Sequence, residues 1–207
     1  MNILLVNGSP NKKGCTNRAL EEVANTLSEN GVDNEILWLG NKPMQDCIAC
    51  YKCRETGRCI FDDIVNETAD RFDEFDGIVI GSPVYYSGAT GTLCSFMDRL
   101  FFSMGHDRLA GKLGASVVSC RRGGSTATFQ RLNQFFLIAN MNIVGSQYWN
   151  QVHGFTPEDV EKDLEGLQTM RTLARNIASL LKAQKEYEKN GFEKPKHEDV
   201  VSINFIE

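Results

Sequence analysis

The chain has no long hydrophobic run and no surplus of positive charge. Its 207 residues carry 22 Lys and Arg against 27 Asp and Glu, a formal net charge of -5, which argues against a nucleic-acid partner. No stretch approaches membrane-spanning length, and the short apolar run at residues 3–6 has no basic segment before it, so we expect neither a signal peptide nor a membrane partner. A cytoplasmic location is expected, where thiols stay reduced.

Several catalytic motifs are missing. The three histidines, His106, His153 and His197, are far apart, and none pairs with a cysteine or carboxylate at metal-ligand spacing. There is no Gly-x-Ser-x-Gly elbow, which disfavours hydrolase chemistry. There is no Gly-x-Gly-x-x-Gly fingerprint, and Gly14 is followed by Cys-Thr rather than the Lys-Ser of a Walker A loop. Tight nicotinamide binding is therefore disfavoured, and we assign no general acid or base.

Cysteine is concentrated in one segment, with the spacing Cys47-x2-Cys50-x2-Cys53-x5-Cys59. Three thiols two residues apart can face one centre, and a fourth after Gly57 can close it, which suits a [4Fe-4S] cluster. Zinc usually takes two separated Cys-x2-Cys pairs, and the second pair is missing here. The cluster is the leading interpretation, with zinc and free or disulfide-linked thiols as alternatives. The dispersed cysteines are expected to be small buried hydrophobes: Cys15, Cys94 and Cys120.

Apolar runs and helical periodicity alternate along the chain. Strands are predicted at residues 3–7, 35–39, 77–81, 115–119 and 142–145, and helices at 16–27, 62–72, 92–102 and 126–139, with a long closing helix from Pro157. Because crossovers between parallel strands are right-handed and both apolar faces need cover, we predict an α/β fold, a flavodoxin-like three-layer sandwich with a five-stranded parallel sheet. One domain should span residues 1–185. The tail at 186–207, with an apolar run at 200–206, is expected to dock on its own domain or on a neighbouring subunit.

Three loops are expected to meet at the carboxyl ends of the strands, where such sheets bind ligands. The first, residues 8–17, leads into a helix whose free N–H groups and dipole suit a phosphate, although an ordinary polar turn is the alternative. The second, residues 81–91, has a proline, two tyrosines and three glycines that suit a flat ring. The third, residues 119–125, brings Arg121 and Arg122, whose charge would stabilise an anionic reduced flavin. The cysteine loop follows the second strand, so we expect it at the same edge.

These segments together resemble a known family. The Gly-Ser-Pro…Gly-Cys-Thr-Asn loop, the Gly-Ser-Pro-Val-Tyr-Tyr segment and the compact cysteine motif are similar to those of the iron–sulfur flavoprotein branch of the NADPH-dependent FMN reductase family. The resemblance implies bound FMN and a [4Fe-4S] cluster held by Cys47, Cys50, Cys53 and Cys59. The residues that it implies for FMN are Ser9, Pro10, Thr16, Asn17, Pro83, Val84, Tyr85, Tyr86, Ser87, Gly88, Ser119, Arg121, Arg122, Gly123 and Gly124.

The resemblance also implies a homodimer or homotetramer in which a neighbour completes the flavin pocket. Tyr148 and Trp149 either cover that flavin from the neighbour or form a packed core pair. The leading function is an FMN-dependent oxidoreductase whose cluster relays electrons to or from FMN, with a small molecule or a ferredoxin-like protein as partner and NAD(P)H as a possible co-substrate. Alternatives are an NAD(P)H-dependent FMN or quinone reductase without a cluster, a non-enzymatic electron carrier, and a zinc-stapled assembly module.

Overall fold

The computed structural model describes residues 1–193, 195, 198, 201, 203 and 205. The strands are β1 (Asn2–Asn7), β2 (Asp33–Trp38), β3 (Gly77–Pro83), β4 (Leu113–Cys120), β5 (Asn142–Ile143) and β6 (Gln151–His153). The α-helices are α1 (Cys15–Glu29), α2 (Lys52–Thr56), α3 (Ile64–Arg71), α4 (Gly91–Leu109), α5 (Ser125–Ile138), α6 (Pro157–Val160) and α7 (Leu164–Lys189), with a 3-10 turn at Phe72–Glu74.

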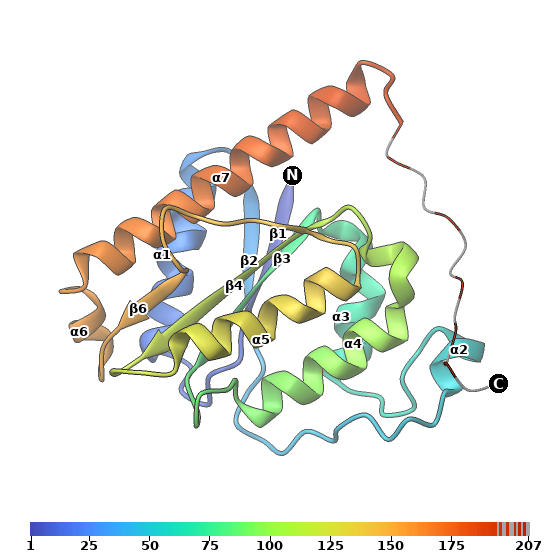
Figure 1. Cartoon of the computed structure of the whole chain (residues 1–207), viewed down its shortest axis with the longest axis horizontal. Helices are drawn as coiled ribbons and strands as arrows, with labels where there is room; N and C mark the ends of the chain where they lie inside the picture. The colour runs from blue at the N-terminus through green and yellow to red at the C-terminus, as the bar shows by residue number, and fades with distance from the viewer. Residues whose placement is uncertain (194, 196–197, 199–200, 202, 204, 206–207) are drawn as a thin grey trace.

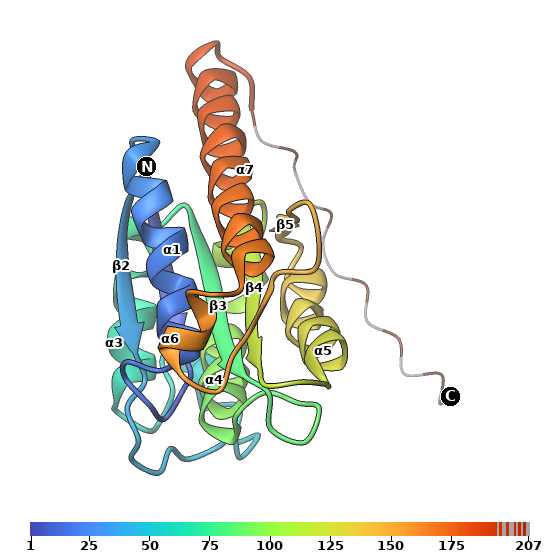
Figure 2. The ribbon, with the colours of Figure 1, turned by 90° about the vertical axis from the view of Figure 1, so that its left-hand side faces the viewer.

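One parallel sheet has the strand order β2-β1-β3-β4-β5, and β6 also pairs with β4. Helices α1 and α7 cover one face, and α3, α4 and α5 cover the other (Figures 1 and 2). Alternate residues of β1 serve the two faces, Ile3 and Leu5 toward α1 and α7, Leu4 and Val6 toward the opposite layer. Strands covered on both sides become continuously apolar. The predicted three-layer flavodoxin-like α/β fold is confirmed.

The fifth position of the sheet differs from the prediction. The strand predicted at residues 142–145 has only two residues, which pair with Leu113 and Gly114 at the start of β4. The chain then leaves the edge and returns as β6 beside residues 118–120. Tyr148 and Trp149 lie in this excursion, 50% and 47% exposed, with their ring centroids 4.8 Å apart. The interpretation as a packed core pair is therefore wrong.

The closing helix is divided. Pro157 begins α6, capped by Thr156, and Asp163 then caps α7 by accepting from the N–H of Gly166 at 2.9 Å. The Asp163 carboxylate also accepts from the N–H of His153 on β6. This bond connects β6 to the segment between α6 and α7. Helix α7 passes the predicted domain end at residue 185. No helix of the described residues is long and apolar enough to cross a membrane.

The C-terminal apolar run is only partly described. Val201, Ile203 and Phe205 are exposed, and residues 200, 202, 204 and 206 lie outside the described residues. Whether the tail docks on its own domain or on a neighbour stays a prediction.

Candidate functional site

The three predicted loops border one cavity at the carboxyl ends of β1, β3 and β4. Its volume is about 630 Å³, within the usual range for cofactor sites. The predicted residues that line it are Ser9, Thr16, Pro83, Val84, Tyr85, Ser119 and Arg121. Residues 154–157, which run from the end of β6 into the first residue of α6, form a further wall. Sequence reasoning missed that wall because it did not find β6, whose three residues give too short a signal.

One end of the cavity has the features of a phosphate cradle. Helix α1 begins after Gly14, which supplies no capping side chain, and its first turn has no acidic residue, so its leading N–H groups and positive dipole end suit an anion. The hydroxyl of Thr16 on α1 bonds that of Ser119 on β4, with an Oγ1···Oγ distance of 2.8 Å. Lys12 and Lys13 are exposed and border the same cavity. These donors and cations fit the phosphate of FMN.

Tyr85, which lines the cavity, begins a strained turn. Tyr85 and Gly88 exchange two backbone hydrogen bonds of 2.9 Å, and the residues between them, Tyr86 and Ser87, have φ of 50° and 61°. Bulky residues rarely adopt this left-handed backbone. Gly124, with φ of 88°, lies against this turn. A Cβ at Gly124 would stand 2.8 Å from the Oγ of Ser87, so the second and third loops touch. Strain of this kind often marks a ligand clamp.

The remaining predicted FMN residues lie in these loops but do not line the cavity: Pro10, Asn17, Tyr86, Ser87, Gly88, Arg122, Gly123 and Gly124. Asn17 has its amide engaged, accepting from the Nδ2 of Asn7 at 3.1 Å and donating to Glu21 at 2.6 Å. The buried Asn7 in turn accepts from the N–H of Ser9 at 3.0 Å. Asn17 therefore braces the phosphate loop through Asn7, and its contact with FMN stays a prediction.

Two further contacts around the cavity were not predicted. Trp38, the last residue of β2, donates its indole N–H to the carbonyl of Ser9 at 2.8 Å. Cys15 and Cys120 line the cavity, and Cys120 alone of the dispersed cysteines is buried; Cys15 and Cys94 are half-buried. Burial, with the nearby Asp159 and Glu158, raises the pKa of the Cys15 thiol, so this thiol stays protonated at neutral pH.

The cysteine loop forms a second candidate site. All four thiols, Cys47, Cys50, Cys53 and Cys59, border one small hollow. Burial raises the pKa of the Cys53 thiol, and coulombic repulsion from the other three cysteines raises it further. The residues on either side of Cys50 have left-handed φ, 51° at position 49 and 57° at position 51. These reversals fold the loop so that its thiols converge.

The donor set of this hollow is four cysteines, and thiolates are the usual ligands of iron–sulfur clusters. Among the described residues, no group of three or more His, Cys, Asp or Glu side chains is placed so that it could hold a single metal ion.

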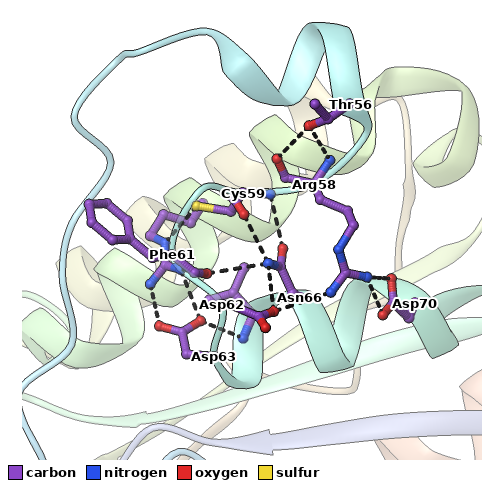
Figure 3. A network of polar contacts seen from close by, with 10 residues as sticks. Thr56, Arg58, Cys59, Phe61, Asp62, Asp63, Asn66 and Asp70 are labelled. Carbon is purple, nitrogen blue, oxygen red and sulfur yellow. Dashed lines mark hydrogen bonds and ion pairs between the residues drawn. The ribbon is translucent and has the colours of Figure 1, made fainter.

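Figure 3 shows how Cys59 is held from α3. The Oδ1 of Asn66 accepts from the N–H of Cys59, and its Nδ2 donates to the carbonyl of Cys59, both at 2.9 Å. Asp63 caps α3 by accepting from the N–H of Val65 at 3.0 Å. Asn66 is buried and was not predicted, because an asparagine in a helical pattern gives no signal that it reaches back to a loop.

Arg99, on α4, holds Cys59 from the other side. Its side chain is 0% exposed and donates to Asp63 at 2.7 and 2.9 Å, to the carbonyls of Phe61 and Gln45 at 2.9 and 3.2 Å, and from Nε to the Sγ of Cys59 at 3.2 Å. These bonds use all five N–H groups of a guanidinium. Sequence reasoning missed Arg99, which has no local signal for a contact forty residues away.

The two candidate sites share no lining residue. The cysteine loop starts at the carboxyl end of β2, as expected, but then runs along the sheet edge to α2, which lies beside α4 and away from α6 (Figure 1). Tyr51 packs against Phe102 with ring centroids 5.9 Å apart, and the Arg54 guanidinium lies 4.8 Å from the Tyr51 ring. The thiols therefore lie beside α4, apart from the cavity bordered by the strand loops.

Comparison with known proteins gives the family. The family model of NADPH-dependent FMN reductases matches residues 1–156. An iron–sulfur flavoprotein of Methanocaldococcus jannaschii is 34% identical over 193 residues, which cover 90% of this chain and 100% of that protein. An iron–sulfur flavoprotein of Methanosarcina thermophila is 28% identical over 184 residues, 87% of this chain and 95% of that one.

A solved structure agrees on the fold. The NAD(P)H:quinone oxidoreductase from Methanothermobacter marburgensis aligns with a TM-score of 0.65 at 17% identity, over 86% of this chain and 98% of that one. The two chains therefore share the fold of the parallel sheet and its covering helices. The chain belongs to the NADPH-dependent FMN reductase family, in its iron–sulfur flavoprotein branch, and is an FMN-dependent oxidoreductase.

Proposed function

We propose that Cys47, Cys50, Cys53 and Cys59 hold a [4Fe-4S] cluster and that the protein passes electrons between this cluster and FMN. The observation that carries the proposal is the convergence of all four thiols on one hollow. The names of the curated relatives, which are iron–sulfur flavoproteins, support it. The cluster would supply single-electron transfer, and FMN would link it to two-electron chemistry.

Each wall of the strand-end cavity has a distinct task in this proposal. The N–H groups at the start of α1 and the Thr16–Ser119 hydroxyl pair would hold the FMN phosphate. Pro83, Val84 and Tyr85 would line the ring. Arg121 would favour the anionic reduced flavin through its positive charge. The half-exposed Tyr85 leaves one side of the cavity open to solvent, so a small acceptor or a ferredoxin-like protein can approach.

NAD(P)H-dependent reduction of FMN or of a quinone is the second candidate. The matching family model is that of NADPH-dependent FMN reductases, and this activity requires no iron. The nicotinamide and the acceptor need not be bound at the same time, because a nicotinamide can bind transiently over the flavin and leave before the acceptor arrives.

We also propose a cytoplasmic homo-oligomer in which a neighbouring subunit covers the cavity. Phe155 lines the cavity and is 78% exposed, and Tyr148 and Trp149 are half exposed nearby in sequence. Large exposed apolar side chains beside a site favour a covering partner. Sedimentation of the FMN-loaded protein would show a dimer or tetramer, and a monomer would contradict this arrangement.

The deciding experiment is a cofactor analysis of protein purified without oxygen. Iron, acid-labile sulfide, zinc and FMN are quantified per chain, and the absorption spectrum is recorded. The proposal expects about four irons and four sulfides per chain, as for a [4Fe-4S] cluster, together with FMN. FMN without iron, combined with oxidation of NADPH by the protein, would move the assignment to the cluster-free reductase. Zinc in place of iron would contradict electron transfer through the cysteine loop.

A further inference from the structure

A buried cation stands against one of the four thiols. Arg99 is 1% exposed, and it follows the exposed Asp98 on α4 among the buried apolar residues Phe96, Met97 and Leu100. A guanidinium in such a position costs free energy unless it is fully paired. Solvation at the surface therefore does not explain why the Arg99 guanidinium lies among buried apolar residues.

Pairing alone does not require the sulfur contact. Asp63 and the carbonyls of Phe61 and Gln45 accept from the two terminal nitrogens of Arg99 and satisfy their four N–H groups. The remaining Nε–H is directed at the Sγ of Cys59, at 3.2 Å. The guanidinium is thus held by oxygen acceptors in an orientation that directs its Nε–H at the thiol of Cys59.

The charges of the pair are unequally screened. The Asp63 side chain is 36% exposed, whereas that of Arg99 is 0% exposed. Water weakens the field of an exposed charge far more than that of a buried one. The local field at the Cys59 sulfur is therefore dominated by the guanidinium, although the pair as a whole is neutral.

We propose that Arg99 raises the reduction potential of the cluster held by the four cysteines, acting as a positioning residue through the sulfur of Cys59. The inference rests on the proposed function. One electron from a low-potential donor enters the cluster and no bond breaks, so the reduced cluster carries one more negative charge. Hydrogen bonds to ligand sulfur and nearby positive charge stabilise that reduced form, which raises the potential.

Two variants at the same ion pair should shift the potential in opposite directions. Arg99→Gln removes the cation and is expected to lower the reduced-to-oxidised ratio at a fixed potential about tenfold, a downward shift of about 59 mV for one electron. Asp63→Asn keeps Arg99 and a good helix cap, removes the balancing negative charge, and is expected to shift the potential upward. Arg99→Lys keeps the charge without the guanidinium and should fall between wild type and Arg99→Gln.

The readout is an anaerobic redox titration of the holoprotein, followed by electron paramagnetic resonance, with iron content measured first. Wild type without iron would refute the proposed function itself. Iron-loaded protein in which Asp63→Asn does not move the potential upward would refute the role of Arg99 alone. If Arg99→Gln loses its iron, iron-loaded Arg99→Lys decides, because it keeps the charge and removes the Nε–H donor to the Cys59 sulfur; a potential equal to that of wild type in this variant would refute the inference. Opposite shifts in the two variants would support the inference.

Discussion

A single methyl group added at Gly124 should disturb the contact between the second and third loops beside the strand-end cavity. The φ of 88° at Gly124 lies in the left-handed region, and a Cβ there would meet the Oγ of Ser87 at 2.8 Å and the Cγ1 of Val84 at 2.9 Å. The left-handed backbone costs about 1–2 kcal/mol for a residue with a Cβ, and overpacking adds about 1–3 kcal/mol. Gly124→Ala should therefore destabilise the protein by about 3 kcal/mol.

Thermal unfolding of the flavin-free protein tests this value. For a chain of this size, a loss of about 3 kcal/mol corresponds to a fall in Tm of about 6–12 °C. Gly123→Ala is the matched control, because a Cβ at position 123 meets nothing within 4 Å and its φ is not positive. The control should melt within about 2 °C of wild type.

FMN binding supplies the second readout for Gly124→Ala. Val84 lines the cavity, so its displacement by the new methyl group should weaken FMN binding, measured by the fluorescence of released flavin. Equal melting temperatures for Gly124→Ala and Gly123→Ala would refute the close contact between the second and third loops. A destabilised variant with unchanged FMN affinity would show that this contact serves the fold and not the cofactor.

Three further predictions address the cysteine loop, the flavin and the acid stability. Cys50→Ser should abolish iron binding while FMN remains bound, because the two sites share no lining residue; loss of both cofactors from a folded variant would contradict this separation. Arg121→Ala should lower the midpoint potential of bound FMN, measured by a spectroscopic redox titration, because a cation favours the anionic reduced ring. Burial would raise the pKa of Asp76, but bonds from the N–H of Asn2 and from Lys185 outweigh it and lower that pKa. Asp76→Asn should therefore cost about 1 kcal/mol at pH 7, and the difference from wild type should shrink as the pH falls from the usual pKa of an aspartate through the lowered pKa of Asp76 in the folded protein, which urea unfolding at pH 7 and pH 3 would check.

The fold could be predicted from the sequence because the two patterns that specify it, apolar runs for strands and helical periodicity for helices, are local. The apolar runs that became β1, β3 and β4 are buried on both faces, and such runs are readable without any partner. The strand predicted at residues 142–145 is shorter in the structure, where β5 has two residues, and the three-residue β6 could not be predicted, because so few residues carry no period. The break between α6 and α7 was missed because Asp163 makes its cap only once β6 lies beside it.

In the candidate sites, too, the residues with a local sequence signal could be predicted and those that act through tertiary contacts could not. The strand-end loops and the cysteines were found because glycine, proline, tyrosine and thiol groups gather in short segments of the sequence. Arg99 and Asn66 were not, because each acts across a tertiary contact, forty and seven residues from Cys59. A buried charge inside an apolar helical stretch is the one local sign that Arg99 offered, and it does not name the partner.

The cysteine loop contributes nothing to either hydrophobic core. Neither cluster of buried residues contains a member from residues 45–63, and Cys59 is fastened by polar bonds from α3 and α4. Small zinc domains are different, because their metal supplies the folding free energy. Under the proposed function, the chain would therefore complete its fold without help from the metal. In biogenesis, iron and sulfide would then be delivered to a finished acceptor, and a cell short of iron would accumulate a folded, flavin-bearing protein.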